Sequence, residues 1–171
     1  MDLVIFWTIF ILGPIPIIHI LLHVFLGVWR RCPRKFYQTA LGFWISFFFF
    51  AKWQAGNLDV LFTPPMWLKI LCTIAIVSLF FLIIWSIMTL KPQRFFLWAT
   101  LQFESVQQKK ISLGPYKYFH HPAYTAYVVI AFAAFFGTGR TVLLAFASFM
   151  ILLMLIVILR ENHELSERFG R

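Results

Sequence analysis

Long apolar stretches are the feature that most constrains how this chain can fold. A helix that crosses a lipid bilayer needs about 20 apolar residues, and five stretches approach or exceed that length. They run over Leu3–Trp29, Tyr37–Ala51, Met66–Leu90, Pro122–Phe136 and Thr141–Leu159. Hydrophobic residues make up 61% of the 171 positions, against roughly 45–50% in a soluble domain, so a soluble catalytic domain is excluded. The sequence predicts an all-α integral membrane protein with about five transmembrane helices.

The connections between these stretches are too short to hold a second folded unit, so residues 1–171 are expected to form one multi-pass domain. Residues 1–90 would supply three spans, and residues 91–171 a polar connector, a last helical hairpin and a C-terminal tail. Gly13, Pro14 and Pro16 inside the first span predict a kink rather than a break. Residues 52–65 read as an irregular connection, and Gly-Thr-Gly at 137–139 as a tight turn.

The basic residues predict the orientation of the spans. Twelve of the 15 Lys and Arg residues follow the first, third and fifth spans, and cytoplasmic loops carry such an excess. The N-terminus is therefore expected outside and the C-terminus in the cytoplasm, in a bacterial plasma membrane or the endoplasmic reticulum. The net charge of +9 follows from this topology and suits anionic lipid headgroups, so no nucleic-acid partner is expected. Met1-Asp2 lacks the basic start of a signal peptide, so the first span is expected to be retained.

The sequence "GPYKYFHHPAYTAY", Gly114 to Tyr127, places aromatic rings and two histidines at one membrane boundary. Pro122 suits the first position of a helix, which makes His121 the expected N-cap. A span from Pro122 to Phe136 is only about 22 Å long, against a hydrocarbon core of about 30 Å, so its open N-terminus is expected to lie below the membrane surface. It would face a recess for a polar ligand, lined by Tyr116, Tyr118, Phe119, His120, His121 and Tyr124.

A second polar cluster follows the last span, in "LRENHELSERFGR". The tight turn makes the fourth and fifth spans antiparallel neighbours, so Glu161 should return to the end of the molecule that holds His121. An acidic group beside aromatic rings at a helix N-terminus suits a ligand with both cationic and anionic groups.

These two segments together resemble a known family. "GPYKYFHHPAY", a hairpin of roughly 35 residues and "ENHELSERFG" are similar to the C-terminal signature of the isoprenylcysteine carboxyl methyltransferase family and of its relatives among the phospholipid methyltransferases. The resemblance covers Gly114 to Gly170. It implies a small integral membrane enzyme that binds S-adenosylmethionine at the cytoplasmic face and methylates a lipid-like substrate.

By position in the family motif, the resemblance implies a set of cofactor-binding residues. The set is Ile111, Tyr116, His121, Pro122, Ala123, Tyr124 and Glu161. No metal is expected, because the sequence holds no zinc motif. The chain departs from the motif at three places. His120 stands where the family usually has arginine, Asn162 replaces a second glutamate, and Val157 occupies the position of an arginine that holds substrate in the prenylcysteine enzymes.

The methyl acceptor is expected to be a membrane-embedded lipophilic or prenylated molecule. As methyl acceptor, the carboxylate of an isoprenylcysteine-like substrate is slightly favoured over a phospholipid amine. Arg160 is the expected catalytic anchor of a carboxylate, and His120 is the expected catalytic base for an amine. A third hypothesis is a non-catalytic membrane scaffold or chaperone that has kept the fold. The sequence leaves the oligomeric state open.

His19 and His23 lie four residues apart on the first span, a spacing that could suggest a metal pair. No Cys, Asp or Glu lies nearby in the sequence to complete such a site. We expect a structural or interhelical hydrogen-bonding role for both. A disulfide between Cys32 and Cys72 is not expected, because they fall at different depths of the membrane.

Overall fold

The computed structural model describes residues 2–56, 59–91, 101 and 112–169, without the side chains of residues 165 and 167–169. Its regular elements within these ranges are helical. They are α1 (Leu3–Leu12), α2 (Pro14–Val24), α3 (Leu26–Arg31), α4 (Pro33–Gln54), α5 (Met66–Leu90), the 3₁₀ turn η2 (Gly114–Lys117), α8 (Pro122–Thr138) and α9 (Thr141–Phe169). The predicted all-α class is confirmed.

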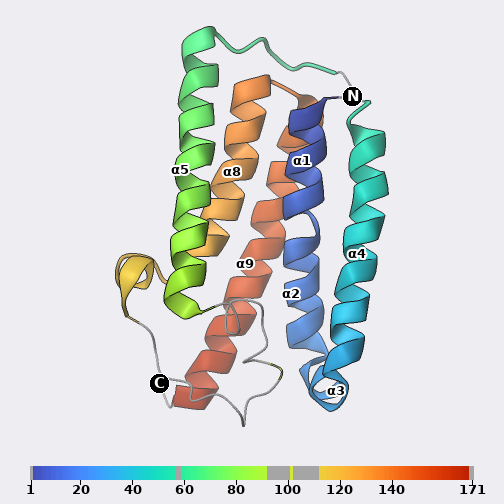
Figure 1. Cartoon of the computed structure of the whole chain (residues 1–171), viewed down its shortest axis with the longest axis vertical. Helices are drawn as coiled ribbons and strands as arrows, with labels where there is room; N and C mark the ends of the chain where they lie inside the picture. Colours follow the sequence, from blue (N-terminus) through green and yellow to red (C-terminus); the bar gives the residue numbers. More distant parts are fainter. Residues whose placement is uncertain (1, 57–58, 92–100, 102–111, 170–171) are drawn as a thin grey trace.

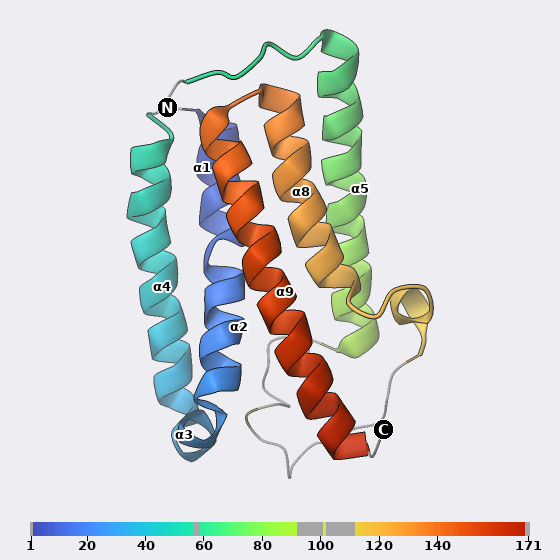
Figure 2. The ribbon, with the colours of Figure 1, turned by 180° about the vertical axis from the view of Figure 1, so that it is seen from behind.

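The long helices stand side by side and alternate in direction (Figures 1 and 2). α8 lies between α5 and α9, α2 packs against α9, and α4 covers the outer side of α1 and α2. The two ends of the chain lie at opposite ends of this bundle. α3, the last turn of α5, η2 and the end of α9 gather at the end that holds the C-terminus. The described members of the predicted basic excess, among them Arg30, Arg34 and Lys91, lie at this end, whereas the side of the membrane that it faces stays a prediction.

Three helical stretches in the described ranges are long and apolar enough to cross a membrane: Leu3–Val24, Met66–Leu90 and Thr141–Glu164. α8 has 17 residues and is shorter. The second predicted span, Tyr37–Ala51, is the central part of the 22-residue helix α4, whose charged first turn the sequence analysis left outside. The count of five spans and the multi-pass topology therefore stay predictions.

The kink predicted in the first span is present. Gly13 keeps helical backbone angles, and its N–H donates to the carbonyl of Ile9 at 2.9 Å. α2 begins directly with Pro14, whose missing N–H cannot continue the ladder. The span ends earlier than predicted, because Phe25 leaves helical geometry and α3 turns away (Figure 1).

Small side chains bring α8 close to its neighbours. Ala126, Ala131 and Ala134 are buried against the surrounding helices, as expected where membrane helices approach closely. On α9 the buried stripe runs through Leu143, Met150, Met154 and Val157. Large hydrophobic side chains of α4 and α5, among them Phe49 and Phe81, are exposed instead, which suits a surface that faces lipid.

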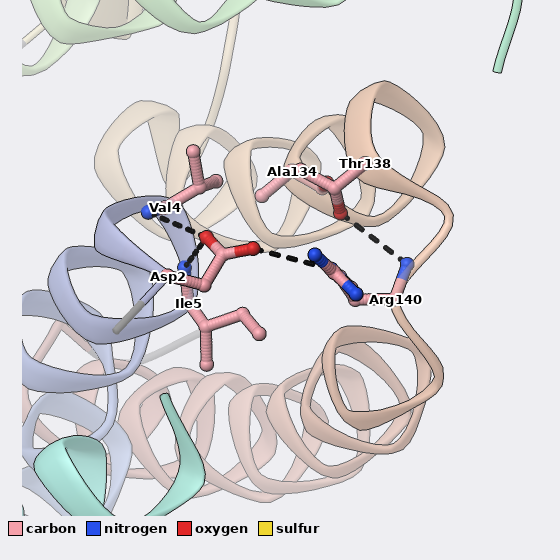
Figure 3. A network of polar contacts seen from close by, with 6 residues as sticks. All are labelled: Asp2, Val4, Ile5, Ala134, Thr138 and Arg140. Atoms are coloured by element: carbon pink, nitrogen blue, oxygen red, sulfur yellow. Dashed lines mark hydrogen bonds and ion pairs between the residues drawn. The ribbon is translucent and has the colours of Figure 1, made fainter. Parts of the chain in front are cut away.

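At the end that holds the N-terminus, Asp2 connects three segments, and Figure 3 shows its contacts with two of them. One carboxylate oxygen caps α1 by accepting from the N–H groups of Val4 and Ile5, at 3.0 and 3.2 Å. The other oxygen pairs with Nε of Arg140 at 3.1 Å. The backbone N–H of Asp2 donates to Ala55 beyond α4, at 2.9 Å. Asp2 thus connects α1, the end of α4 and the α8–α9 connection.

The connection between α8 and α9 is shorter than the predicted turn, because α8 continues through Thr138. Gly139 ends the helix with φ of 70°, and its N–H donates to the carbonyl of Phe135 at 2.7 Å. A Cβ atom at this position would lie 1.8 Å from the carbonyl oxygen of Phe62. Both the backbone angle and the close approach therefore require glycine.

We predict that Gly139→Ala lowers the free energy of unfolding by more than about 1–2 kcal/mol, since the left-handed backbone alone costs that much and the clash adds to it. Gly42→Ala is the matched control, because a Cβ there meets nothing within 4 Å inside α4. It should be neutral or stabilising by roughly 0.5–1 kcal/mol. Denaturant unfolding in detergent, followed by circular dichroism, measures both. Equal effects of the two substitutions would contradict the assigned role of Gly139.

Candidate functional site

The two polar clusters expected from the sequence meet at the end of the bundle that holds the C-terminus. Nδ1 of His121, at the start of α8, lies 3.6 Å from Oε2 of Glu161 on α9. Nε2 of the same ring lies 3.1 Å from Oδ1 of Asn162. Oxygen atoms of α9 thus face both ring nitrogens. Asn162, which replaces the second glutamate of the family motif, still contacts the histidine of that motif.

Helical spacing explains why α9 presents acidic groups here. Met150, Met154 and Val157 form its buried stripe, and the same three- and four-residue steps continue to Glu161 and Glu164. The face of α9 that packs apolar side chains inside the bundle therefore carries two carboxylates at its end. Val157 is fully buried.

Glu161 is the least satisfied polar group of this cluster. Its Oε2 is buried and has no hydrogen-bond partner among the described residues. The charge of the same carboxylate also acts on the nearby Tyr124. A buried carboxylate oxygen without a donor is uncommon in folded proteins, so it marks a place where a ligand with N–H groups or positive charge would be stabilised.

Three rings continue the cluster from α8 to α2. His121 stacks on Tyr124, with centroids 5.4 Å apart and 7° between the planes. The Tyr124 ring meets His19 of α2 edge-on at 5.3 Å. The Nδ1–H of His19 donates to the carbonyl of Ile15 at 2.8 Å, because a carbonyl oxygen can only accept.

A second histidine–glutamate pair joins α2 to α9. Nδ1 of His23 lies 2.7 Å from Oε1 of Glu164. The expected interhelical hydrogen-bonding role is therefore confirmed for His23. Its partner Glu164 was not predicted from the sequence, although Glu164 lies one helical turn after Glu161.

Tyr116 approaches the cluster from η2, which packs against α5. Gly114 allows this contact, since its φ is 57° and an added Cβ would lie 2.6 Å from Oγ1 of Thr89. Burial and the nearby charge of Glu161 raise the pKa of Tyr116 to about 12, although a hydrogen bond with Ser86 acts in the opposite direction. The phenol therefore stays neutral at physiological pH.

The remaining predicted residues divide into three groups. Pro122 and Ala123 are buried at the start of α8, where His121 is the N-cap as predicted, although its side chain makes no capping hydrogen bond. Tyr118 is 70% and Phe119 46% exposed, and their place in the expected recess stays a prediction. The side chains of His120 and Arg160 are also exposed. Ile111 lies outside the described residues.

We predict that Tyr116→Phe protein loses less stability than wild type between about pH 10 and 12. Above pH 10 the unfolded tyrosine releases a proton that folded Tyr116 keeps up to about pH 12. The unfolded state then binds fewer protons, so stability falls as the pH rises. Thermal unfolding across this range measures the slope. Tyr118→Phe, on an exposed ring, is the control, and identical slopes in the two variants would contradict the prediction.

Comparison with known proteins adds one finding. The sequence model of the phospholipid methyltransferase family matches residues 67–171. The match includes α5, η2, α8 and α9, and so Tyr116, His121 and Glu161, whereas α2 with its two histidines lies outside it. Comparison with curated proteins and with solved structures gave no match.

Proposed function

This chain belongs to the phospholipid methyltransferase family, and from that premise we propose that it methylates the headgroup amine of a membrane lipid with S-adenosylmethionine. The observation that carries the proposal is the buried Oε2 of Glu161, which lacks a hydrogen-bond partner in the described part of the chain. It lies beside the stacked rings of His121 and Tyr124. The family supports a membrane methyltransferase, and the acceptor is part of the proposal.

The residues at this place fit the cofactor. S-adenosylmethionine, when bound, supplies a methyl group on a positively charged sulfur, together with an ammonium, a carboxylate and an adenine ring. Glu161 would stabilise the positive charge through the carboxylate oxygen that has no hydrogen-bond partner among the described residues. Ala123 and Tyr124 present N–H groups in the first turn of α8, where no side chain caps the helix, and such a turn suits a carboxylate. The ring of Tyr124 would stack against an aromatic or cationic group.

The protein would also keep water away from the reacting groups. The side chains of Pro122 and Ala123 are buried at the start of α8. The neutral, half-buried phenol of Tyr116 lies near Glu161. Methyl transfer needs the donor carbon and the nucleophile in line and close together.

The charges of the cluster favour an amine over a carboxylate as acceptor. Glu161 and Glu164 extend the buried stripe of α9, whereas Arg160 is exposed and Val157 supplies no charge. An acceptor carboxylate would meet two like charges here, and an ammonium would be attracted. The sequence slightly favoured the isoprenylcysteine carboxylate as acceptor over the amine. That carboxylate is the alternative that the acceptor experiment tests.

We predict that Glu161→Gln weakens S-adenosylmethionine binding by roughly tenfold to more than a hundredfold, because a charge-assisted hydrogen bond contributes about 1.5–3 kcal/mol. Calorimetry with purified protein in lipid nanodiscs measures the affinity. Asp59→Asn removes an exposed carboxylate near the start of α9, where the carbonyl of Asp59 accepts from the N–H of Thr141, and should leave the affinity unchanged. Binding unaltered by Glu161→Gln would contradict the proposed cofactor site.

We also predict that wild-type protein transfers a radiolabelled methyl group to phosphatidylethanolamine in vesicles and that Arg160→Ala retains this activity within about twofold, since the exposed guanidinium would be screened by solvent. His120→Ala, compared in parallel, tests the base predicted from the sequence. A farnesylcysteine acceptor is offered separately. Labelling of its carboxylate that collapses in Arg160→Ala would contradict the amine assignment, and labelling of neither acceptor would support the scaffold hypothesis.

A further inference from the structure

We infer that the His23–Glu164 pair is the proton acceptor for the lipid amine, and that α2, outside the part of the chain that matches the family, thereby supplies a catalytic residue. The inference rests on the proposed function, because it assumes an amine acceptor. It assigns the role of base to His23 rather than to His120, the base expected from the sequence, whose side chain is exposed.

The hydrogen bond within the pair determines which ring nitrogen is basic. Oε1 of ionised Glu164 can only accept, so Nδ1 of His23, 2.7 Å away, carries the proton. In the neutral ring the lone pair is then on Nε2. The residues that the structure describes offer Nε2 no hydrogen-bond partner. A carboxylate behind Nδ1–H fixes the tautomer and stabilises the imidazolium that forms when Nε2 takes up a proton.

The pair lies beside the proposed cofactor residues. Glu164 follows Glu161 by three positions and His23 follows His19 by four, so each is one helical turn from a member of the ring cluster. His19 contacts Tyr124, and the charge of Glu161 acts on His19. α2 packs against α9, and Figure 2 shows the middle of α9 beside α2, with the lower end of α9 leaning away from it. The base and the cofactor site would therefore share one end of the α2–α9 contact.

Stability alone does not explain this pair. The side chains of His23 and Glu164 are only 5% and 20% exposed, and desolvating two ionisable groups offsets most of what their attraction contributes. Apolar residues of similar volume would hold the two helices together about as strongly. Ionisable side chains inside a membrane helix more often serve transport or chemistry.

The chemistry of the acceptor requires a base. With an amine pKa near 10.4, as in lysine, fewer than about one headgroup in a thousand is neutral at pH 7. The ammonium R–NH₃⁺ would give one proton to Nε2 of His23, which becomes an imidazolium paired with Glu164. The amine lone pair then forms the N–CH₃ bond while the S–CH₃ bond breaks and its electron pair stays on sulfur. The product R–NH₂⁺–CH₃ leaves, and His23 returns its proton to water.

Other charged and titratable groups surround His23 on the elements packed against or near α2. α2 itself adds His19, and α3 and the start of α4 add basic side chains that are exposed. They include His19, Arg30, Arg31, Arg34, Lys35, Tyr37, Tyr116, His121, Tyr124, Arg160, Glu161, His163 and Glu164. Of these, Glu164 is in direct contact with the His23 ring.

The experiment measures the rate of phosphatidylethanolamine methylation from pH 5.5 to 9.5, with S-adenosylmethionine binding measured on the same samples. Wild type should show a rate that rises with pH and then levels off. His23→Gln should lower the neutral-pH rate by about 100-fold or more, the usual effect of losing a general base. Its remaining rate should climb about tenfold per pH unit without levelling, because only the free amine then reacts. Cofactor affinity should change by less than about twofold.

Glu164→Gln provides a second variant should His23→Gln fail to fold. It keeps an acceptor oxygen but removes the charge, and it should lower the rate by about 10- to 100-fold. His163→Gln is the matched control, an exposed histidine beside the pair on α9, and should retain the wild-type profile. Nitrogen-15 NMR of neutral His23 should show the proton on Nδ1, independently of turnover.

The outcomes separate the two proposals. The wild-type protein methylates the amine if the proposed function is correct. If His23→Gln then shows the same rate and pH profile as wild type, the role of the pair is overturned and the proposed function stays intact. Glu164→Gln gives the same test when it is the one variant that folds. A neutral His23 ring protonated on Nε2 overturns the role of the pair as well. Wild-type protein that neither binds the cofactor nor methylates the amine overturns the proposed function and, with it, the proton acceptor. The predicted loss of the plateau together with unchanged cofactor binding supports both.

Discussion

Close packing of α8 against its neighbours is the constraint on which the rest of the structure depends. Its buried alanines let α5 and α9 approach from two sides and α1 from a third. In lipid, apolar surfaces gain little from leaving the solvent, so helices associate where small side chains give close backbone contact. This packing places the start of α8 and the end of α9 together. His121 and Glu161 can therefore meet although they are forty residues apart in the sequence.

Local signals in the sequence predict the parts of the site that depend on one helix or one hairpin. Pro122 marks the start of α8, and the glycine turn returns α9 to the same end, so the meeting of His121 with the polar end of α9 could be predicted. The end of α9 was placed too early, because the prediction equated the helix with its membrane-spanning part. The residues after Leu159 are mostly good helix formers and continue to Phe169.

Other parts depend on tertiary contacts that one sequence does not reveal. The exposure of Tyr118 and Phe119 follows from how η2 docks on α5, and the spacing of aromatic residues says nothing about that docking. The partner of His23 could not be predicted either, because it requires α2 to lie beside α9. An i, i+4 histidine pair and an i, i+3 glutamate pair were visible separately. Only the packing of the two helices shows that they face each other.

Two side-chain pairs join α1–α2 to α9 at opposite ends of the bundle. Asp2 pairs with Arg140 just before α9, and His23 pairs with Glu164 near the end of α9. Apolar helix surfaces in a bilayer discriminate poorly between alternative registers, since a shift of one turn exchanges one set of hydrocarbon contacts for another. A shift of α1–α2 along α9 by one turn, 5.4 Å, would separate both ion pairs at once. The two pairs together therefore fix one register of α1–α2 along α9.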